Sequence, residues 1–142
     1  MKLIQHLLEA KGGELISIQP DASVLDAIKL MAEKGIGSLV VTEGDSLKGI
    51  VTERDYARKV IIKGRASDST AIAEIMTTDV VTTSSDQTVQ QCMAIMTKIK
   101  CRHLPVVDDG HLVGMISIGD LVQAIIADQQ EEIEQLEHYI SG

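Results

Sequence analysis

The sequence predicts a mixed α/β fold of the α+β kind, made of two β-α-β-β-α repeats with a further helix at each end. Three observations support this fold class. The 142-residue chain repeats itself at an interval of 65 residues, each repeat alternates strand-like and helix-like apolar spacing, and 44% of the residues are hydrophobic. Because a unit of about 60 residues buries too little surface to be stable alone, we expect the repeats to pair about a pseudo-twofold axis with their sheets face to face.

The repeat appears when the sequence is shifted against itself by 65 residues. Residues 20–58 then align with residues 85–123 without a gap, and eight of the 39 aligned pairs are identical. Chance alone would give about two or three identities. The identical pairs include Met31 with Met96, Gly49 with Gly114, and Asp55 with Asp120. The chain is therefore a tandem duplication.

Apolar spacing and turn residues place the elements of the first repeat. Val24, Ile28 and Met31 recur at helical spacing, while Ser23 and Gly35 have the residue types of a helix N-cap and a helix stop. The expected order is a strand over 14–19, this helix, a strand over 39–41, a turn over 43–46, a strand over 47–52 and a second helix. The second repeat has the same pattern, preceded by a polar linker over 63–69 and a short helix over 70–76.

These elements suggest four segments. They are an N-terminal helical segment 1–13, a first repeat 14–69, a second repeat 70–127 and an acidic C-terminal helix 128–142. In the last segment, apolar residues recur at alternating intervals of four and three, which is the spacing of a coiled-coil seam with one polar break. The seam positions are Val122, Ile126, Gln129, Ile133, Leu136 and Ile140. This face either packs on its own module or forms a dimer contact.

Charge and composition argue against several classes of protein. A net charge of −8 disfavours nucleic acid and anionic membrane surfaces as partners. No apolar run approaches the roughly 18 residues of a membrane span, and the first residues lack a signal-peptide pattern, so we expect a cytoplasmic protein. Cys92 and Cys101 have no metal-site spacing, and the four histidines are scattered, so we expect free thiols and no metal.

One motif stands at the same place in both repeats, where a strand leads into a helix. It runs Gly-Ile-Val-Thr-Glu-Arg-Asp over 49–55 and Gly-Met-Ile-Ser-Ile-Gly-Asp over 114–120. Thr or Ser followed three residues later by an acidic residue is also an ordinary capping box. However, capping requires no glycine three residues earlier. A helix N-terminus with a hydroxyl could bind phosphate, and a carboxylate at this spacing could accept hydrogen bonds from a ribose diol.

With this motif, its β-α-β-β-α setting and the Arg-His-Leu-Pro-Val strand at 102–106, the chain resembles a tandem cystathionine-β-synthase (CBS) domain pair, or Bateman module. The resemblance covers roughly residues 14–127 and extends to small bacterial proteins made of little but this module. It implies a cleft that binds adenine nucleotides: AMP, ADP, ATP or NAD(H), with S-adenosylmethionine ranked behind them. The implied site residues are Thr52, Arg54, Asp55, Arg102, His103, Pro105, Ser117, Gly119, Asp120 and Ser38.

Within this resemblance, the aspartates would hold ribose, the hydroxyls would lie near ribose and phosphate, and basic residues of the partner repeat's central strand would contact phosphate. Arg102 and His103 correspond to Gly37 and Ser38 in the first repeat. If each cleft combines the motif of one repeat with the strand of the other, the cleft of Asp55 is the more basic. We expect that cleft to take the more phosphorylated ligand.

The expected function is a non-catalytic sensor of adenine nucleotides. The alternative is a dimerisation or partner-docking module whose nucleotide sites are vestigial. An enzyme is disfavoured because the chain has no phosphate-binding P-loop, no GxGxxG motif and no set of nucleophile, base and orienting group. Since CBS pairs commonly form dimers, the resemblance also implies a homodimer, and a separate regulated protein would receive any signal.

Overall fold

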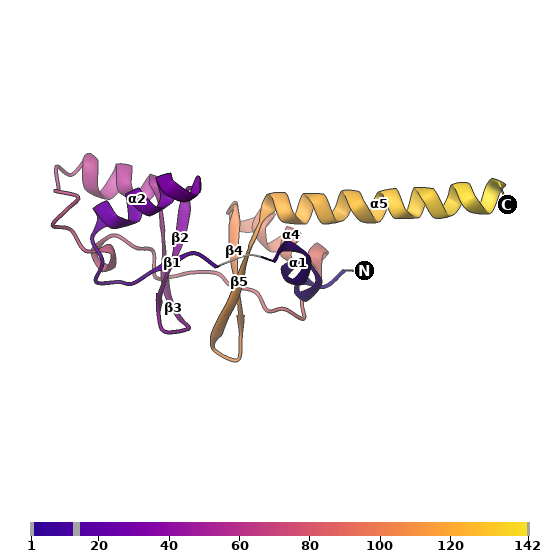
Figure 1. Ribbon diagram of the computed structural model, residues 1–142, viewed down its shortest axis with the longest axis horizontal. Coiled ribbons are helices and arrows are strands. Elements are labelled where there is room, and N and C mark those ends of the chain that lie inside the picture. Colours follow the sequence, from indigo (N-terminus) through magenta and orange to yellow (C-terminus); the bar gives the residue numbers. More distant parts are fainter. Residues whose placement is uncertain (1, 13–14, 142) are drawn as a thin grey trace. The chain divides into compact units, whose positions relative to one another are not determined.

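The computed structural model describes residues 2–12 and 15–141, which divide between two compact units (Figure 1). The first-repeat unit contains residues 14–81 with 109–112, and the second-repeat unit contains 1–13, 82–108 and 113–142. Each unit has its own aliphatic core and its own small sheet. Mixed helices and strands in two small sheets confirm the predicted fold class.

The first-repeat unit is built on a three-stranded sheet in which β1 pairs parallel to β2 and β2 pairs antiparallel to β3. As predicted, the Ser23 hydroxyl caps α2 by accepting the Asp26 N–H, and Gly35 ends α2 in the left-handed region. The predicted first strand shortens to two residues. The elements are β1 Ser17–Ile18, α2 Val24–Lys34, β2 Ser38–Glu43, β3 Ser46–Thr52, α3 Glu53–Tyr56, a π-helix Ala57–Ile61 and a 3₁₀ helix Ile72–Glu74.

The second-repeat unit has a two-stranded sheet, β4 with β5. The predicted strand ahead of its first helix is not formed, and among the described residues a single parallel bridge between Thr83 and Val106 takes its place. The next residues bond through side chains instead: the Ser85 hydroxyl and N–H both donate to Asp108, which competes with a backbone ladder. The elements are α1 Ile4–Lys11, α4 Val89–Ile99, β4 His103–Asp108, β5 His111–Ser117 and α5 Ile118–Ser141.

The segment ahead of each repeat packs on the opposite repeat. The Ile4 N–H at the start of α1 donates to Gln87 O at 2.9 Å, and the Ile72 N–H donates to Ala22 O at the same distance. Gln87 and Ala22 are equivalent in the 65-residue alignment. Helix α1 therefore packs on the second repeat in the same way that residues 72–76 pack on the first. The first-repeat unit therefore begins at the predicted boundary of 14 but runs past the boundary at 70 as far as residue 81, and the boundary at 128 falls inside α5.

This packing explains the glycine of each repeated motif. A Cβ atom on Gly114 would lie 2.5 Å from Leu8 Cδ2 of α1, and one on Gly49 would lie 2.7 Å from Thr77 O. Both distances are far below van der Waals contact, so a side chain at either glycine would require the Leu8 side chain or the Thr77 backbone to move. The motif glycine thus has a packing role in this chain, separate from any ligand.

Candidate functional site: two capped carboxylates

Thr52 and Asp55 form a reciprocal cap where β3 leads into α3. The Thr52 hydroxyl oxygen accepts the Asp55 N–H at 3.1 Å, and Asp55 Oδ2 accepts the Thr52 N–H at 3.0 Å. Asp55 Oδ2 also lies 3.1 Å from the Thr52 hydroxyl. The capping interpretation of the motif is therefore correct in this repeat, and the same contacts hold the carboxylate in one orientation.

Lys59 holds the other side of the Asp55 carboxylate. Its ammonium lies 3.1 Å from Asp55 Oδ1 and donates to Ile75 O at 2.8 Å. The Asp55 side chain is only 13% exposed. Both of its oxygens therefore have partners, and a ligand hydroxyl that bonds to Oδ1 must share this oxygen with Lys59 or displace it.

Ser117 and Asp120 repeat the cap where β5 leads into α5. Asp120 Oδ2 accepts the Ser117 N–H at 2.8 Å, and the Ser117 hydroxyl oxygen accepts the Asp120 N–H at 3.1 Å. Lys11 of α1 also donates to Oδ2 at 3.0 Å and to Met115 O at 3.1 Å. Within the part of the chain that the structure describes, Oδ1 of Asp120 accepts no hydrogen bond.

The Asp120 carboxyl is held in its ionised form. Burial raises its pKa, but the Ser117 N–H, the Lys11 ammonium and the Ser117 hydroxyl together outweigh burial and hold the pKa below its usual value. A side chain that stays charged and keeps one oxygen open is a hydrogen-bond acceptor. This is the property that binding a diol requires.

The first backbone N–H of each helix is bonded inside its own repeat. The Glu53 N–H donates to Gly37 O at 3.0 Å, and the Ile118 N–H donates to Arg102 O at 2.9 Å. The third N–H of each helix goes to the capping hydroxyl. Fewer helix N–H groups are therefore open to an anion than the sequence suggested, which leaves any phosphate mainly to cationic side chains.

His103 lies in the electrostatic neighbourhood of Asp120, Lys11 and Arg102 in its own unit. Burial lowers the pKa of the half-buried His103, the Lys11 and Arg102 charges lower it further, and the Asp120 charge opposes them. Arg102 itself is exposed. The prediction that Arg102 and His103 serve Asp55 of the other repeat depends on how the units are placed, and it stays a prediction.

The other predicted site residues occupy varied positions. Ser38 is buried on β2 directly opposite Thr52, while Arg54 and Gly119 are exposed in the first turns of α3 and α5. Pro105 is buried as the third residue of β4. Its carbonyl oxygen accepts the Thr83 N–H of the isolated bridge.

Sequence reasoning missed both lysines that pair with the aspartates. Lys59 lies four residues after Asp55, an ordinary helical ion-pair spacing that could have been noticed. Lys11 is 109 residues away from Asp120 and belongs to no motif. Its only signal was indirect: the amphipathic pattern of α1 predicts that this helix packs somewhere.

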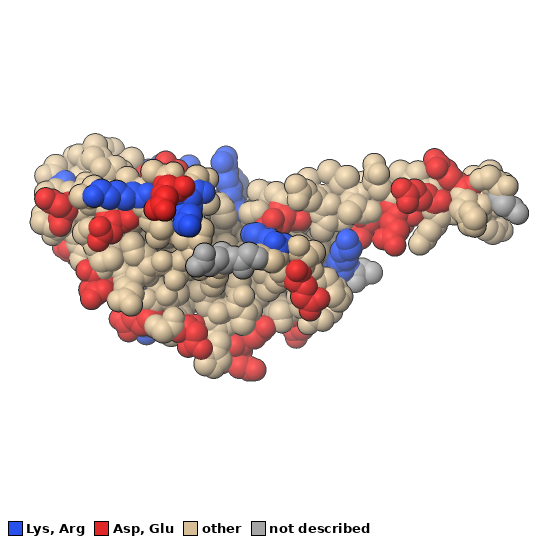
Figure 2. Space-filling model, in the orientation of Figure 1, with Lys and Arg blue, Asp and Glu red and all other residues tan. Residues whose placement is uncertain are grey.

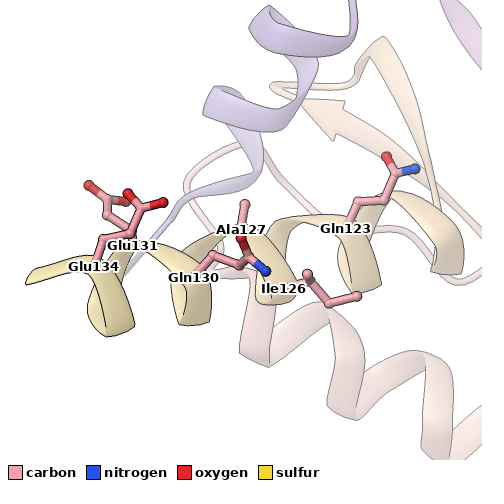
Figure 3. A pocket seen from close by; sticks show the side chains of 6 residues that line it. All are labelled: Gln123, Ile126, Ala127, Gln130, Glu131 and Glu134. Atoms are coloured by element: carbon pink, nitrogen blue, oxygen red, sulfur yellow. The ribbon is translucent and has the colours of Figure 1, made fainter. Parts of the chain in front are cut away.

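Cysteines, metal sites and cavities add no second centre. Both cysteines are free, as expected, and burial raises the pKa of each thiol. No group of three or more His, Cys, Asp or Glu side chains in the described ranges is placed to hold a metal ion. A shallow groove of about 400 Å³ is lined by α5 alone (Figure 3). None of the candidate site residues lines this groove, and none of the helices described is long and apolar enough to cross a bilayer.

Comparison with known proteins gives the family. The family model for the CBS domain matches residues 13–62 and 72–127. The chain is 39% identical over 148 residues to the mitochondrial CBS domain-containing protein CBSX3 of Arabidopsis thaliana, covering 98% of this chain and 72% of that protein.

Solved structures agree with this match. A protein with CBS domains from Burkholderia ambifaria MC40-6 shares 50% identity at a TM-score of 0.82, over 90% of this chain and 96% of the other. The CBS-domain-containing protein ATU1752 of Agrobacterium tumefaciens shares 38% identity at a TM-score of 0.78, over 87% and 98% of the two chains. CBS pairs are generally regulatory modules without catalysis of their own. With two repeats that match the family model and relatives that are 39% and 50% identical, this chain belongs to the CBS-domain family.

Proposed function

We propose that this chain is a non-catalytic regulatory module that binds adenine nucleotides (AMP, ADP, ATP or NAD(H)) at its two Thr/Ser–Asp motifs. The observation that carries the proposal is Asp120. This carboxylate is oriented by Ser117 and Lys11 through Oδ2, while Oδ1 has no partner among the described residues. One open, charged and oriented acceptor suits a ribose hydroxyl. Lys11 supplies positive charge beside this carboxylate for a phosphate.

The same observations support binding without catalysis. Asp55 and Asp120 each form an ion pair with a lysine, and they belong to separate compact units. The lowered pKa of Asp120 makes it a poor proton donor at neutral pH. Binding would then act by favouring one arrangement of the module over another, with a partner protein receiving the signal.

A thermal melt followed by an external dye tests this proposal, because the chain has no tryptophan. AMP, ADP, ATP, NAD⁺, NADH and S-adenosylmethionine are compared in parallel. A ligand at about 100 times its Kd adds roughly 2.7 kcal/mol to the free energy of unfolding. For a chain of this size the expected rise in Tm is about 5–10 °C.

The matched variants are Asp55→Asn with Asp120→Asn, compared with Asp26→Asn. Asparagine keeps an oxygen for the capping bond but removes the charge. Asp26 is also an acidic third residue of a helix whose cap is Ser23, without the preceding glycine motif. We expect the nucleotide shift to survive in Asp26→Asn and to vanish in the double variant. A protein that shows no shift with any of these ligands at millimolar concentration is not a nucleotide sensor.

A further inference from the structure

Helix α5 is much longer than its contacts with the second-repeat unit require. Leu121 and Ala124 are buried in the core of that unit, and Asp128 pairs with Lys2 at 3.5 Å. From residue 129 to residue 141 every residue is exposed, and in Figure 1 this part of α5 extends as a single helix beyond α1 and α4. An isolated helix of about this length is marginal in water. The extension therefore lacks a packing partner within its own unit.

One face of α5 carries an apolar seam from end to end. The seam residues follow intervals of four and three, and they avoid the face that holds Leu121 and Ala124. The packing interpretation of this face is therefore wrong for the second-repeat unit: even Val122 and Ile126, beside the core, stay exposed. The exposed fractions are 43% for Val122, 52% for Ile126, 53% for Ile133, 62% for Leu136 and 83% for Ile140.

Charge on α5 is sorted around this seam. When Ile126, Ile133 and Ile140 are taken as a positions of a heptad, three acidic residues fall at outward c, f and b positions and two fall at flanking g and e positions. The outward residues are Asp128, Glu131 and Glu134, and the flanking residues are Glu132 and Glu137. Figure 2 shows acidic side chains along the extended end of the helix. The groove in Figure 3 borders the seam at Ile126, but Glu131 and Glu134 also line it, so it lies beside the seam and not along it. Hence two such faces can meet while most of the acidic groups remain in water.

We propose that the α5 seam is the contact through which two copies of this chain associate, helix against helix. The 4-3 spacing is self-complementary, since identical seams fit each other knobs-into-holes. Gln129 at a d position is the kind of single polar core residue that sets register in such pairs. Given their exposed fractions, the apolar seam residues present on the order of 500 Å² of surface per copy. With the stems of the flanking Gln and Glu side chains, this approaches the roughly 800 Å² that one partner gives to a stable interface.

The test is the mass of the full-length chain in solution, measured by light scattering and sedimentation from about 1 to 100 µM. We expect a dimer, and we expect Ile133→Glu to raise its dissociation constant at least tenfold. The control Gln135→Glu adds the same charge at an outward c position and leaves the dimer intact. Gln129→Leu completes the apolar seam and is expected to tighten association at least tenfold, a gain that misfolding cannot imitate. Far-ultraviolet circular dichroism checks that each variant folds.

Three results would overturn the proposal. The first is a wild-type chain that stays monomeric at 100 µM. The second is equal masses for Ile133→Glu and Gln135→Glu. The third is a monomer that binds a basic amphipathic helical peptide along α5, because the acidic helix would then serve a different protein. None of these readouts depends on nucleotide binding, so the association and the proposed function can fail separately.

Discussion

Adding one methyl group at the motif glycines distinguishes the packing of the two repeats. In Gly49→Ala the new Cβ would lie 2.7 Å from the backbone oxygen of Thr77, whereas in Gly114→Ala it would lie 2.5 Å from the end of the Leu8 side chain. A leucine side chain can rotate away from a new methyl group. A backbone carbonyl moves only if its segment moves, so the clash at Gly49 is expected to cost more to relieve than the closer clash at Gly114.

The structure sets the size of the effect. Thr77 and Ile50 exchange two backbone hydrogen bonds, of 2.9 and 2.8 Å, and pushing the strand away from residue 77 weakens both. Two bonds of about 1 kcal/mol each, with some overpacking, are partly offset by the reduced freedom of alanine in the unfolded chain. We expect Gly49→Ala to lower the free energy of unfolding by about 2 kcal/mol. Gly114→Ala should lower it by less than about 1 kcal/mol.

Urea unfolding followed by circular dichroism at 222 nm measures both variants against the wild type. A loss of about 2 kcal/mol corresponds to a fall in Tm of roughly 4–8 °C. A Gly49→Ala protein within about 0.5 kcal/mol of wild type would refute the packing argument. So would a Gly114→Ala protein that is the less stable of the two.

Other predictions concern helix ends and charge. Lys100 ends α4 at φ +57°, at the position where the first repeat has Gly35 at φ +66°. Lys100→Gly should therefore raise the free energy of unfolding by about 1 kcal/mol, and Gly35→Ala should lower it by a similar amount. Urea titrations measure both changes. Lys11→Met removes a cation that lowers the pKa of His103, so this pKa should rise in the variant. A histidine NMR titration measures it, and an unchanged pKa would contradict the closeness of Lys11 to His103. Because the pKa of His103 is lower in the folded than in the unfolded chain, its contribution to stability is present above pH about 6.5 and is lost as pH falls through the folded pKa. As pH is lowered from 8 to 5, the Tm of the wild type should therefore fall more than the Tm of His103→Gln.

The predictable parts of this molecule were those encoded locally or by the repeat. The cap of α2 by Ser23, its end at Gly35 and the β2–β3 hairpin follow from residue types at short range, and the structure has all three. The reciprocal contacts between Thr52 and Asp55 were foreseeable for the same reason. The repeat then carried each of these expectations to the second half.

What could not be predicted depends on contacts between distant segments. No local pattern states that α1 packs on the second repeat, so neither the Lys11–Asp120 pair nor the reason for Gly114 was visible. The strand before α4 is missing because Ser85 donates two hydrogen bonds to the Asp108 side chain, and these bonds compete with backbone pairing. The seam spacing along α5 can be recognised in the sequence. Whether the seam is covered depends on which face of α5 is buried with Leu121, and only the structure shows this.

The most direct test of the account is calorimetric titration of AMP and ATP into the wild-type chain, Asp120→Asn and Asp26→Asn. We expect measurable binding to the wild type, at least tenfold weaker binding of AMP to Asp120→Asn, or about 1.4 kcal/mol, and unchanged binding to Asp26→Asn. Asp55→Asn, titrated in the same way, shows whether the more phosphorylated ligand prefers the other motif. Equal affinities of wild type and Asp120→Asn for both nucleotides would contradict the claim that the open Asp120 oxygen binds ribose.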